Sequence, residues 1–136
     1  MSVFVIAEAG VNHNGNLDLA KKIIKEAFQI GADAVKFQTF KASNLTTKYA
    51  ASTEYQKRQN YKSQFNMLSQ LELSYDQFRD LKKYADELGI VFMSSAFDVE
   101  SIEFIKSLQL PVWKIPSGEI TNLPYLRLIS KYADKI

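Results

Sequence analysis

The feature that most constrains the fold is a repeated order along the chain: a short apolar run, a turn, and then an amphipathic stretch. The runs cover residues 3–7, 33–37, 90–93 and 110–115, and each is short enough for a strand buried on both faces. The stretches between them carry apolar residues at steps of three and four, the period of a helix with one buried face. Four strand–helix units in a row predict an α/β protein with a parallel sheet.

Capping residues mark the ends of the expected helices. Ser74 and Gln77 have the spacing of a capping box, and Asp98 precedes another helical stretch. Gly31 and Gly89 follow the first two long helical stretches, where a helix commonly ends in a left-handed glycine.

Residues 40–72 interrupt this order. The stretch is polar and longer than an ordinary connection from a strand to a helix. We therefore expect a partly helical excursion that lies over the strand ends.

Two architectures fit four strand–helix units. A doubly wound sheet would be complete at this length, whereas a (β/α)₈ TIM barrel needs roughly 250 residues, so this chain would be its first half. Periodicity does not choose between them. Both place ligands at the C-terminal ends of the strands.

Composition excludes several classes of function. The 136 residues carry a net charge of only +2 with no basic tract, which argues against nucleic-acid binding. No run is long enough to span a membrane, and the N-terminus lacks the features of a signal peptide, so we expect a cytoplasmic protein. There is no cysteine, and His13 is the only histidine, so we expect no metal site built from this chain and a structural role for His13 in a loop.

Two lysines lie between apolar neighbours near predicted strand ends. Lys36 and Lys114 would form a clamp for a phosphate or carboxylate if their ammonium groups meet. The alternatives are a structural ion pair with a carboxylate, or a lysine that forms a Schiff base with a carbonyl substrate, as in an aldolase. The presence of two lysines favours anion binding, because one lysine is enough for a Schiff base.

Other polar residues lie at the same strand ends. Glu8 and Glu119 are candidate acid–base or hydroxyl-binding carboxylates, and the alternative for each is an ion pair with a lysine. Gln38 would share a strand face with Lys36, since the two are separated by two positions. Ser95 and Ser117 would donate hydrogen bonds to the same anion.

Four sequence motifs carry a resemblance to a known family. Residues 6–15 (IAEAGVNHNG), 32–39 (ADAVKFQT), 93–98 (MSSAFD) and 113–122 (WKIPSGEITN) resemble, in order and spacing, the motifs of the sialic acid synthase family. That family includes N-acetylneuraminate, legionaminate and pseudaminate synthases. The resemblance implies a (β/α)₈ barrel followed by a small antifreeze-like domain.

The resemblance also implies a reaction. The family condenses phosphoenolpyruvate with an N-acetylated amino sugar, such as N-acetylmannosamine, to a nonulosonic acid and releases phosphate. It needs a divalent metal, typically manganese. By this resemblance Lys36 and Lys114 bind phosphoenolpyruvate, Ser95 and Ser117 assist them, and Glu8 is the catalytic carboxylate.

Three further residues take roles from the resemblance. Gln38 matches a residue near the metal, Glu119 matches a carboxylate that meets the sugar hydroxyls, and Asn60 corresponds to an asparagine near the sugar. The family's metal-binding histidines lie on later strands.

The domain expected from these matches is the N-terminal half of a synthase barrel over residues 1–136, without the second half and the antifreeze-like domain. We expect it to be inactive or nearly so alone, and to form a homodimer or to associate with a chain that supplies the missing half. The alternative is a non-catalytic half-barrel module that binds a phosphorylated or acidic ligand or a partner chain.

Overall fold

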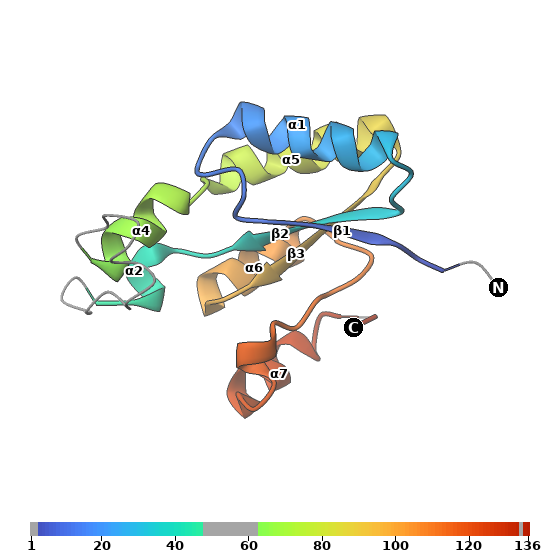
Figure 1. Ribbon diagram of the computed structural model, residues 1–136. Coiled ribbons are helices and arrows are strands. Elements are labelled where there is room, and N and C mark those ends of the chain that lie inside the picture. The colour runs from blue at the N-terminus through green and yellow to red at the C-terminus, as the bar shows by residue number, and fades with distance from the viewer. Residues whose placement is uncertain (1–2, 48–62, 134) are drawn as a thin grey trace.

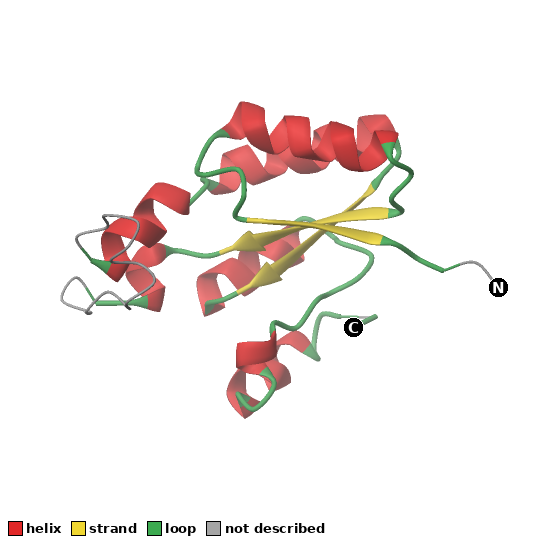
Figure 2. Ribbon diagram, viewed as in Figure 1, coloured by secondary structure: helices red, strands yellow, loops and turns green. Residues whose placement is uncertain are grey.

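The computed structural model describes residues 3–47, 63–133 and 135–136. Its described part contains a three-stranded parallel sheet in the order β1-β2-β3, connected by helices (Figures 1 and 2). The elements in chain order are β1 (Ile6–Gly10), α1 (Leu17–Gln29), β2 (Ala34–Thr39), α2 (Ala42–Leu45), α4 (Gln64–Leu71), α5 (Tyr75–Leu88), β3 (Val91–Ala96), α6 (Val99–Ser107), the 3₁₀ turn η1 (Ser117–Glu119) and α7 (Leu123–Ile129).

One face of the sheet is covered by α1 and α5, which lie side by side over the strands (Figure 1). The residues that these helices bury are Ala20, Ile24 and Ala27 on α1 and Phe78, Leu81 and Ala85 on α5. They join the buried side chains of the strands, α6 and α7 in one hydrophobic core. This layer holds the strands in place for the site on the other face.

The helix ends follow the capping signals of the sequence. The Ser74 side chain accepts a hydrogen bond from the Gln77 backbone N–H, and the Gln77 side chain accepts one from the Ser74 N–H, which confirms the capping box. Asp98 caps α6 by accepting from the Ser101 N–H at 2.9 Å. Gly89 ends α5 in the left-handed region, at φ +82°.

The strands extend further toward their C-terminal ends than predicted. The apolar runs 3–7, 33–37 and 90–93 end before Glu8, Gln38 and Ser95, yet all three residues lie within the strands. Residues 3–5 lie before β1 and are exposed, so the prediction of a doubly buried strand from residue 3 was wrong. These polar residues can lie within the strands because their side chains are on the sheet face that α1 and α5 do not cover.

The predicted fourth strand is absent from the described residues. The segment 110–115 is a loop between α6 and η1 (Figure 2), so the sheet has three strands rather than four. Pro111 has no N–H to give to a ladder, and the Trp113 N–H donates to the Lys135 carbonyl at 2.9 Å. Within this segment Leu110 and Trp113 are nevertheless buried in the core, whereas Pro111 and Lys114 are exposed, so the apolar run predicted burial only in part.

The excursion after β2 is partly helical, as predicted. It includes α2 and α4, whereas Asn60 lies outside the described residues. Within the part of the chain that the structure describes, no helix has the length and hydropathy of a membrane span.

The first loop packs closely against the end of α4. Gly15 has φ +71°, and a Cβ atom added there would lie 2.2 Å from the Gln70 carbonyl oxygen. Such a contact forces the backbone to move, so only glycine fits this position.

We predict that Gly15→Ala lowers the free energy of unfolding by about 2–4 kcal/mol, from left-handed strain plus overpacking against backbone. Gly89→Ala is the matched control, because Gly89 has φ +82° but no atom within 4 Å of an added Cβ. It should cost only the strain, about 1–2 kcal/mol. Urea unfolding of both variants measures the difference, and equal losses would contradict the packing argument.

Candidate active site

The candidate site lies on the sheet face opposite α1 and α5. Successive strand side chains alternate between faces, so Lys36 and Gln38 share one face of β2. In the parallel register Glu8 lies beside Lys36, and Ser95 lies beside Gln38. Four of the predicted site residues, from three strands, therefore meet on one surface.

A short ion pair forms the centre of this surface. The Lys36 Nζ lies 2.6 Å from the Glu8 Oε2, and the side chains are 12% and 50% exposed. A lysine buried to this extent needs a partner, because desolvation of an unpaired charge is costly. The structure shows the ion pair that was one alternative for Lys36 and Glu8, and the role of both residues in binding or catalysis stays a prediction. Half of the Glu8 side chain remains exposed.

Gly10 allows the polar side chains to come together above the backbone. The β1–β2 register shifts between Glu8 and Gly10, and Gly10 has φ +55°. A Cβ added to Gly10 would lie 3.3 Å from the Glu8 Oε1 and 3.6 Å from the Gln38 Nε2. The sequence prediction did not include Gly10, although a glycine two positions after a strand-end carboxylate was a usable signal.

Ser95 contributes a buried hydroxyl without a partner. Its Oγ has no hydrogen-bond partner within the described residues, although the side chain is only 2% exposed. Ser94 differs, because its Oγ forms a 2.7 Å hydrogen bond with the Thr39 Oγ1 on the helix-covered face. A buried hydroxyl is usually satisfied, so the Ser95 hydroxyl is an exception and a candidate ligand-binding group.

The remaining predicted site residues that the structure describes lie in the loop 110–116 or directly after it. Lys114 is exposed, and its Nζ donates to the carbonyl of the neighbouring Ile115. Ser117 and Glu119 form η1, and the Glu119 Oε2 accepts from the Asn122 Nδ2 at 2.6 Å. The meeting of Lys36 with Lys114 stays a prediction.

Tyr125 connects α7 to the C-terminal end of β3. Its hydroxyl donates to the Ala96 carbonyl at 2.7 Å. Burial raises the pKa of Tyr125, and the negative charges of Glu119 and Asp98 raise it further.

His13 occupies the loop after β1, as predicted. The imidazole is 1% exposed, and its Nδ1 accepts a hydrogen bond from the Gly15 N–H at 3.1 Å. Burial lowers the pKa of His13, so the ring is neutral near pH 7. The described residues contain no group of three or more His, Asp or Glu side chains arranged to hold a metal ion.

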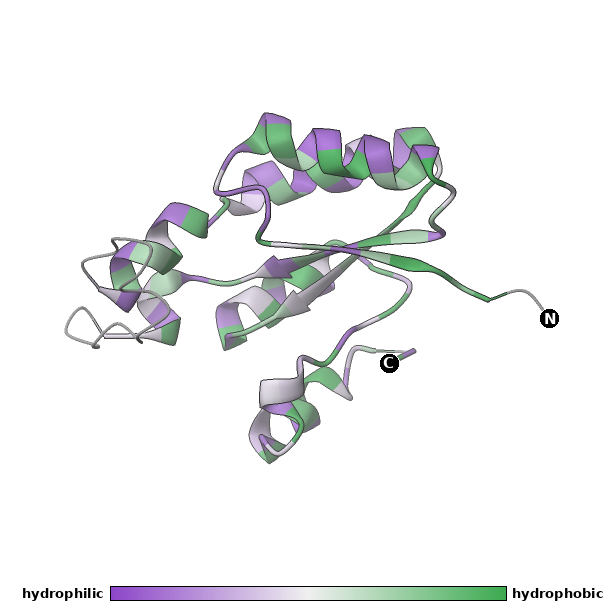
Figure 3. Cartoon of the chain, viewed as in Figure 1, coloured by the Kyte–Doolittle hydropathy of each residue, from purple (hydrophilic) through white to green (hydrophobic). Residues whose placement is uncertain are grey.

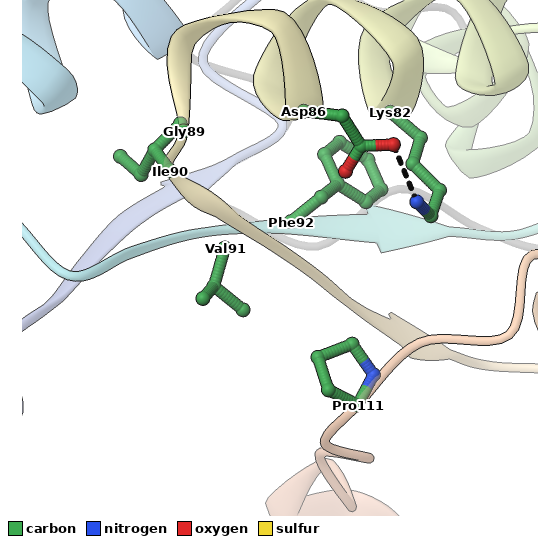
Figure 4. Close-up of a pocket in the computed structure, with 7 residues that line it drawn as sticks. All are labelled: Lys82, Asp86, Gly89, Ile90, Val91, Phe92 and Pro111. Carbon is green, nitrogen blue, oxygen red and sulfur yellow. Dashed lines mark hydrogen bonds and ion pairs between the residues drawn. The ribbon is translucent and has the colours of Figure 1, made fainter.

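Besides the candidate site at the C-terminal ends of the strands, a second hollow lies at the N-terminal end of β3. It has a volume of about 280 Å³ and is lined by residues that include Gly89, Val91 and Pro111 (Figure 4). Its charged side chains, Lys82 and Asp86, are paired at 2.6 Å. It lies at the N-terminal end of the strand, whereas parallel α/β proteins bind substrates at the C-terminal ends.

The fold and site define a parallel α/β protein whose polar strand ends form one surface, as in part of a TIM barrel. The chain belongs to the NeuB family, whose model matches residues 23–136. This confirms the resemblance seen in the four motifs.

Relatives with known names cover nearly all of the chain. An N,N'-diacetyllegionaminic acid synthase of Legionella pneumophila is 54% identical over 129 residues, which are 93% of this chain and 36% of that protein. The human N-acetylneuraminate-9-phosphate synthase is 39% identical over 94% of this chain and 36% of its own length. The chain therefore spans about one third of the curated relatives it matches.

Solved structures agree with the family. An N-acetylneuraminic acid synthetase from Leptospira borgpetersenii, in complex with citrate, matches with a TM-score of 0.81 and 30% identity, over 97% of this chain and 42% of that one. A DAHP synthase from Thermotoga maritima matches with a TM-score of 0.60 and 13% identity, which supports the fold alone. Both neighbours are TIM barrels, so the described sheet corresponds to part of a barrel rather than to a doubly wound sheet.

We predict that acid weakens the fold through His13. Its pKa is lowered by folding, so the unfolded chain binds a proton more readily than the native one. The free energy of unfolding should be constant above pH 6.5 and fall as the pH drops below 6.5 toward the lowered native value. Protonation also removes the Nδ1 lone pair that accepts from Gly15.

Denaturant unfolding between pH 5 and 7.5 measures this dependence. His13 is the only histidine, so His13→Gln should flatten the curve in this window. A curve that keeps its slope in the variant would show that another group is responsible.

Proposed function

We propose that this chain is part of a synthase that condenses phosphoenolpyruvate with an N-acetylated amino sugar and releases phosphate. The observation that carries the proposal is the surface on which Glu8, Lys36, Gln38 and Ser95 meet at the strand ends. Membership of the NeuB family and the names of the relatives support the same reaction.

The site residues have roles that suit a substrate with a phosphate and a carboxylate. Lys36 would bind one of these anions and exchange its contact with Glu8 for one with the substrate. The unpartnered Ser95 hydroxyl would donate to the same anion. Glu8, once released, would act as a base or orient water at the reacting carbons.

Residues beyond the strands would complete the site. In this proposal Lys114 and Ser117 bind the second anionic group, and Glu119 accepts hydrogen bonds from the sugar hydroxyls. Asn60 is assigned to the sugar only by the family resemblance. These roles require the loop 110–116 to bring Lys114 toward Lys36.

A divalent metal, expected to be Mn²⁺, would polarise the sugar aldehyde as a Lewis acid when bound. The family resemblance assigns its ligands to histidines on later strands, so we place them outside this chain. Gln38 would then lie near the metal rather than hold it alone.

A chimera tests the proposed function. The chain replaces the matching third of the Legionella pneumophila relative, and phosphate release from phosphoenolpyruvate is measured with that enzyme's own amino sugar and Mn²⁺. We expect release that depends on both substrates. Binding of phosphoenolpyruvate without release would favour the non-catalytic module, and trapping of substrate by borohydride would favour an aldolase.

Substitution of Lys36 in the chimera tests the site itself. Lys36→Met should lower kcat/KM for phosphoenolpyruvate by about 100-fold or more, because a charge-assisted contact to the substrate is lost. Lys82→Met is the matched control, since Lys82 also pairs with a carboxylate at 2.6 Å but lies on α5 at the second hollow. Equal effects of the two substitutions would contradict the assignment.

Within the described residues β1 is an edge strand, and the segment that leads into it exposes apolar side chains. The segment leading into β1 is hydrophobic (Figure 3), and Val3, Phe4 and Ile6 are 82%, 54% and 43% exposed. On the sheet face that carries Lys36, Phe4 and Ile6 also line an apolar hollow of about 560 Å³ together with Val91 and Met93 of β3. We propose that a second copy, or a chain that supplies the missing strands, covers this edge.

We predict that the chain alone associates at this edge. Sedimentation velocity should show dimers or larger species at micromolar concentration, and Ile6→Lys should shift them toward monomer because it charges the apolar edge. Val99→Lys is the control, since Val99 is equally apolar and 63% exposed but lies on α6. A monodisperse parent monomer would contradict the prediction.

A further inference from the structure

Glu72 binds the chain at two points directly after β2. Its Oε1 lies 3.0 Å from the Lys41 Nζ, and its Oε2 accepts the Ala42 backbone N–H at 2.8 Å. Lys41 is the N-cap residue of α2 and makes no capping hydrogen bond with its own side chain. Glu72, thirty positions further along the chain, supplies that acceptor instead.

Asp98, the N-cap residue of α6, binds the neighbouring backbone N–H group. Its Oδ2 accepts the Lys41 N–H at 2.9 Å, while its Oδ1 caps α6 through the Ser101 N–H. The Lys41 ammonium also lies 4.3 Å from the centre of the Tyr75 ring. Lys41 is therefore held through its backbone and its side chain by three residues, Glu72, Tyr75 and Asp98.

This anchoring occurs where β2 loses the support of β1. The β1–β2 pairing ends at Gly10 and Phe37, so Gln38 has a strand partner only on the β3 side. The next main-chain contacts on β2 are the Phe97 N–H donating to the Thr39 carbonyl, and then the bonds to Lys41 and Ala42. Pairing with β3 and burial restrain this strand end on one side, and Glu72 and Asp98 restrain the residues that follow it.

The segment around Glu72 also contacts the loop that follows β1. A Cβ on Gly15 would lie 2.2 Å from the Gln70 carbonyl oxygen and 3.8 Å from that of Glu72. The residues 70–72 therefore touch the loop after Glu8 and the loop after Gln38. A change at this segment would alter the relative placement of both strand ends.

We infer that Glu72 is a positioning residue: by holding Lys41 and Ala42 it sets Gln38, and the adjacent Glu8–Lys36 pair, in the geometry that the condensation needs. This inference rests on the proposed function. Glu72 acts through the backbone of β2 and touches no substrate in this role.

Kinetics of the chimera test the inference. Glu72→Ala, which removes both contacts, should lower kcat by about 10- to 100-fold with the KM for phosphoenolpyruvate changed less than about threefold, as expected for misplaced reacting groups. Glu72→Gln keeps an acceptor for the Ala42 N–H and should recover most of kcat. Parent-like kcat in Glu72→Ala would overturn the inference.

The control separates positioning from a general loss of a salt bridge. Asp86→Asn breaks the Lys82–Asp86 pair on α5 and should leave kcat unchanged. An equal loss of kcat in Asp86→Asn would overturn the inference. If Glu72→Ala does not fold, kcat is measured in Glu72→Asp, because the shorter side chain cannot make both contacts. A loss of kcat in Glu72→Asp supports the positioning role, and a parent-like kcat overturns it.

A second measurement does not depend on activity. In the ¹⁵N-labelled 136-residue chain, the side-chain amide signals of Gln38 should shift in Glu72→Ala, or in Glu72→Asp if that variant replaces it, and stay in place in Asp86→Asn. If the parent chimera releases no phosphate, the proposed function fails while this shift still supports the positioning of Gln38. Unchanged signals in the Glu72 variant would overturn it.

Discussion

The parallel register that places Glu8 beside Lys36 is the constraint on which the rest of the site depends. Their ion pair neutralises a lysine that is mostly removed from solvent, and it uses two strands that the helix layer holds in place. Gln38 and Ser95 join the pair because alternation along the strands puts them on the same face. The site is thus a property of the sheet rather than of any single loop.

The loops around this surface are set by close backbone contacts and by carboxylates. Gly10 and Gly15 occupy positions where a side chain would meet Glu8, Gln38 or the backbone of residue 70. Glu72 and Asp98 hold the residues after β2 by accepting main-chain N–H groups. These contacts fix the residues that follow β1 and β2, where the pairing between strands ends.

Sequence reasoning found most of the elements and four residues of the site, because both have local signals. The capping box of Ser74 and Gln77 joins positions three apart, and burial follows the apolar period. It placed the strand ends too early, since Glu8, Gln38 and Ser95 are polar although they are strand residues. It also predicted a fourth strand from an apolar run that forms a loop with only Leu110 and Trp113 buried, because apolar residues indicate burial and not strand pairing.

The sequence by itself determined the class of fold, the helix ends and the family, because these depend on residue type and on spacing of a few positions. Only the tertiary structure decided that Lys36 pairs with Glu8, that Ser95 keeps a free hydroxyl among the described residues, and that Glu72 holds Ala42. The reason is distance along the chain: such partners are about thirty or more positions apart, so their contact exists only once the strands have taken their register.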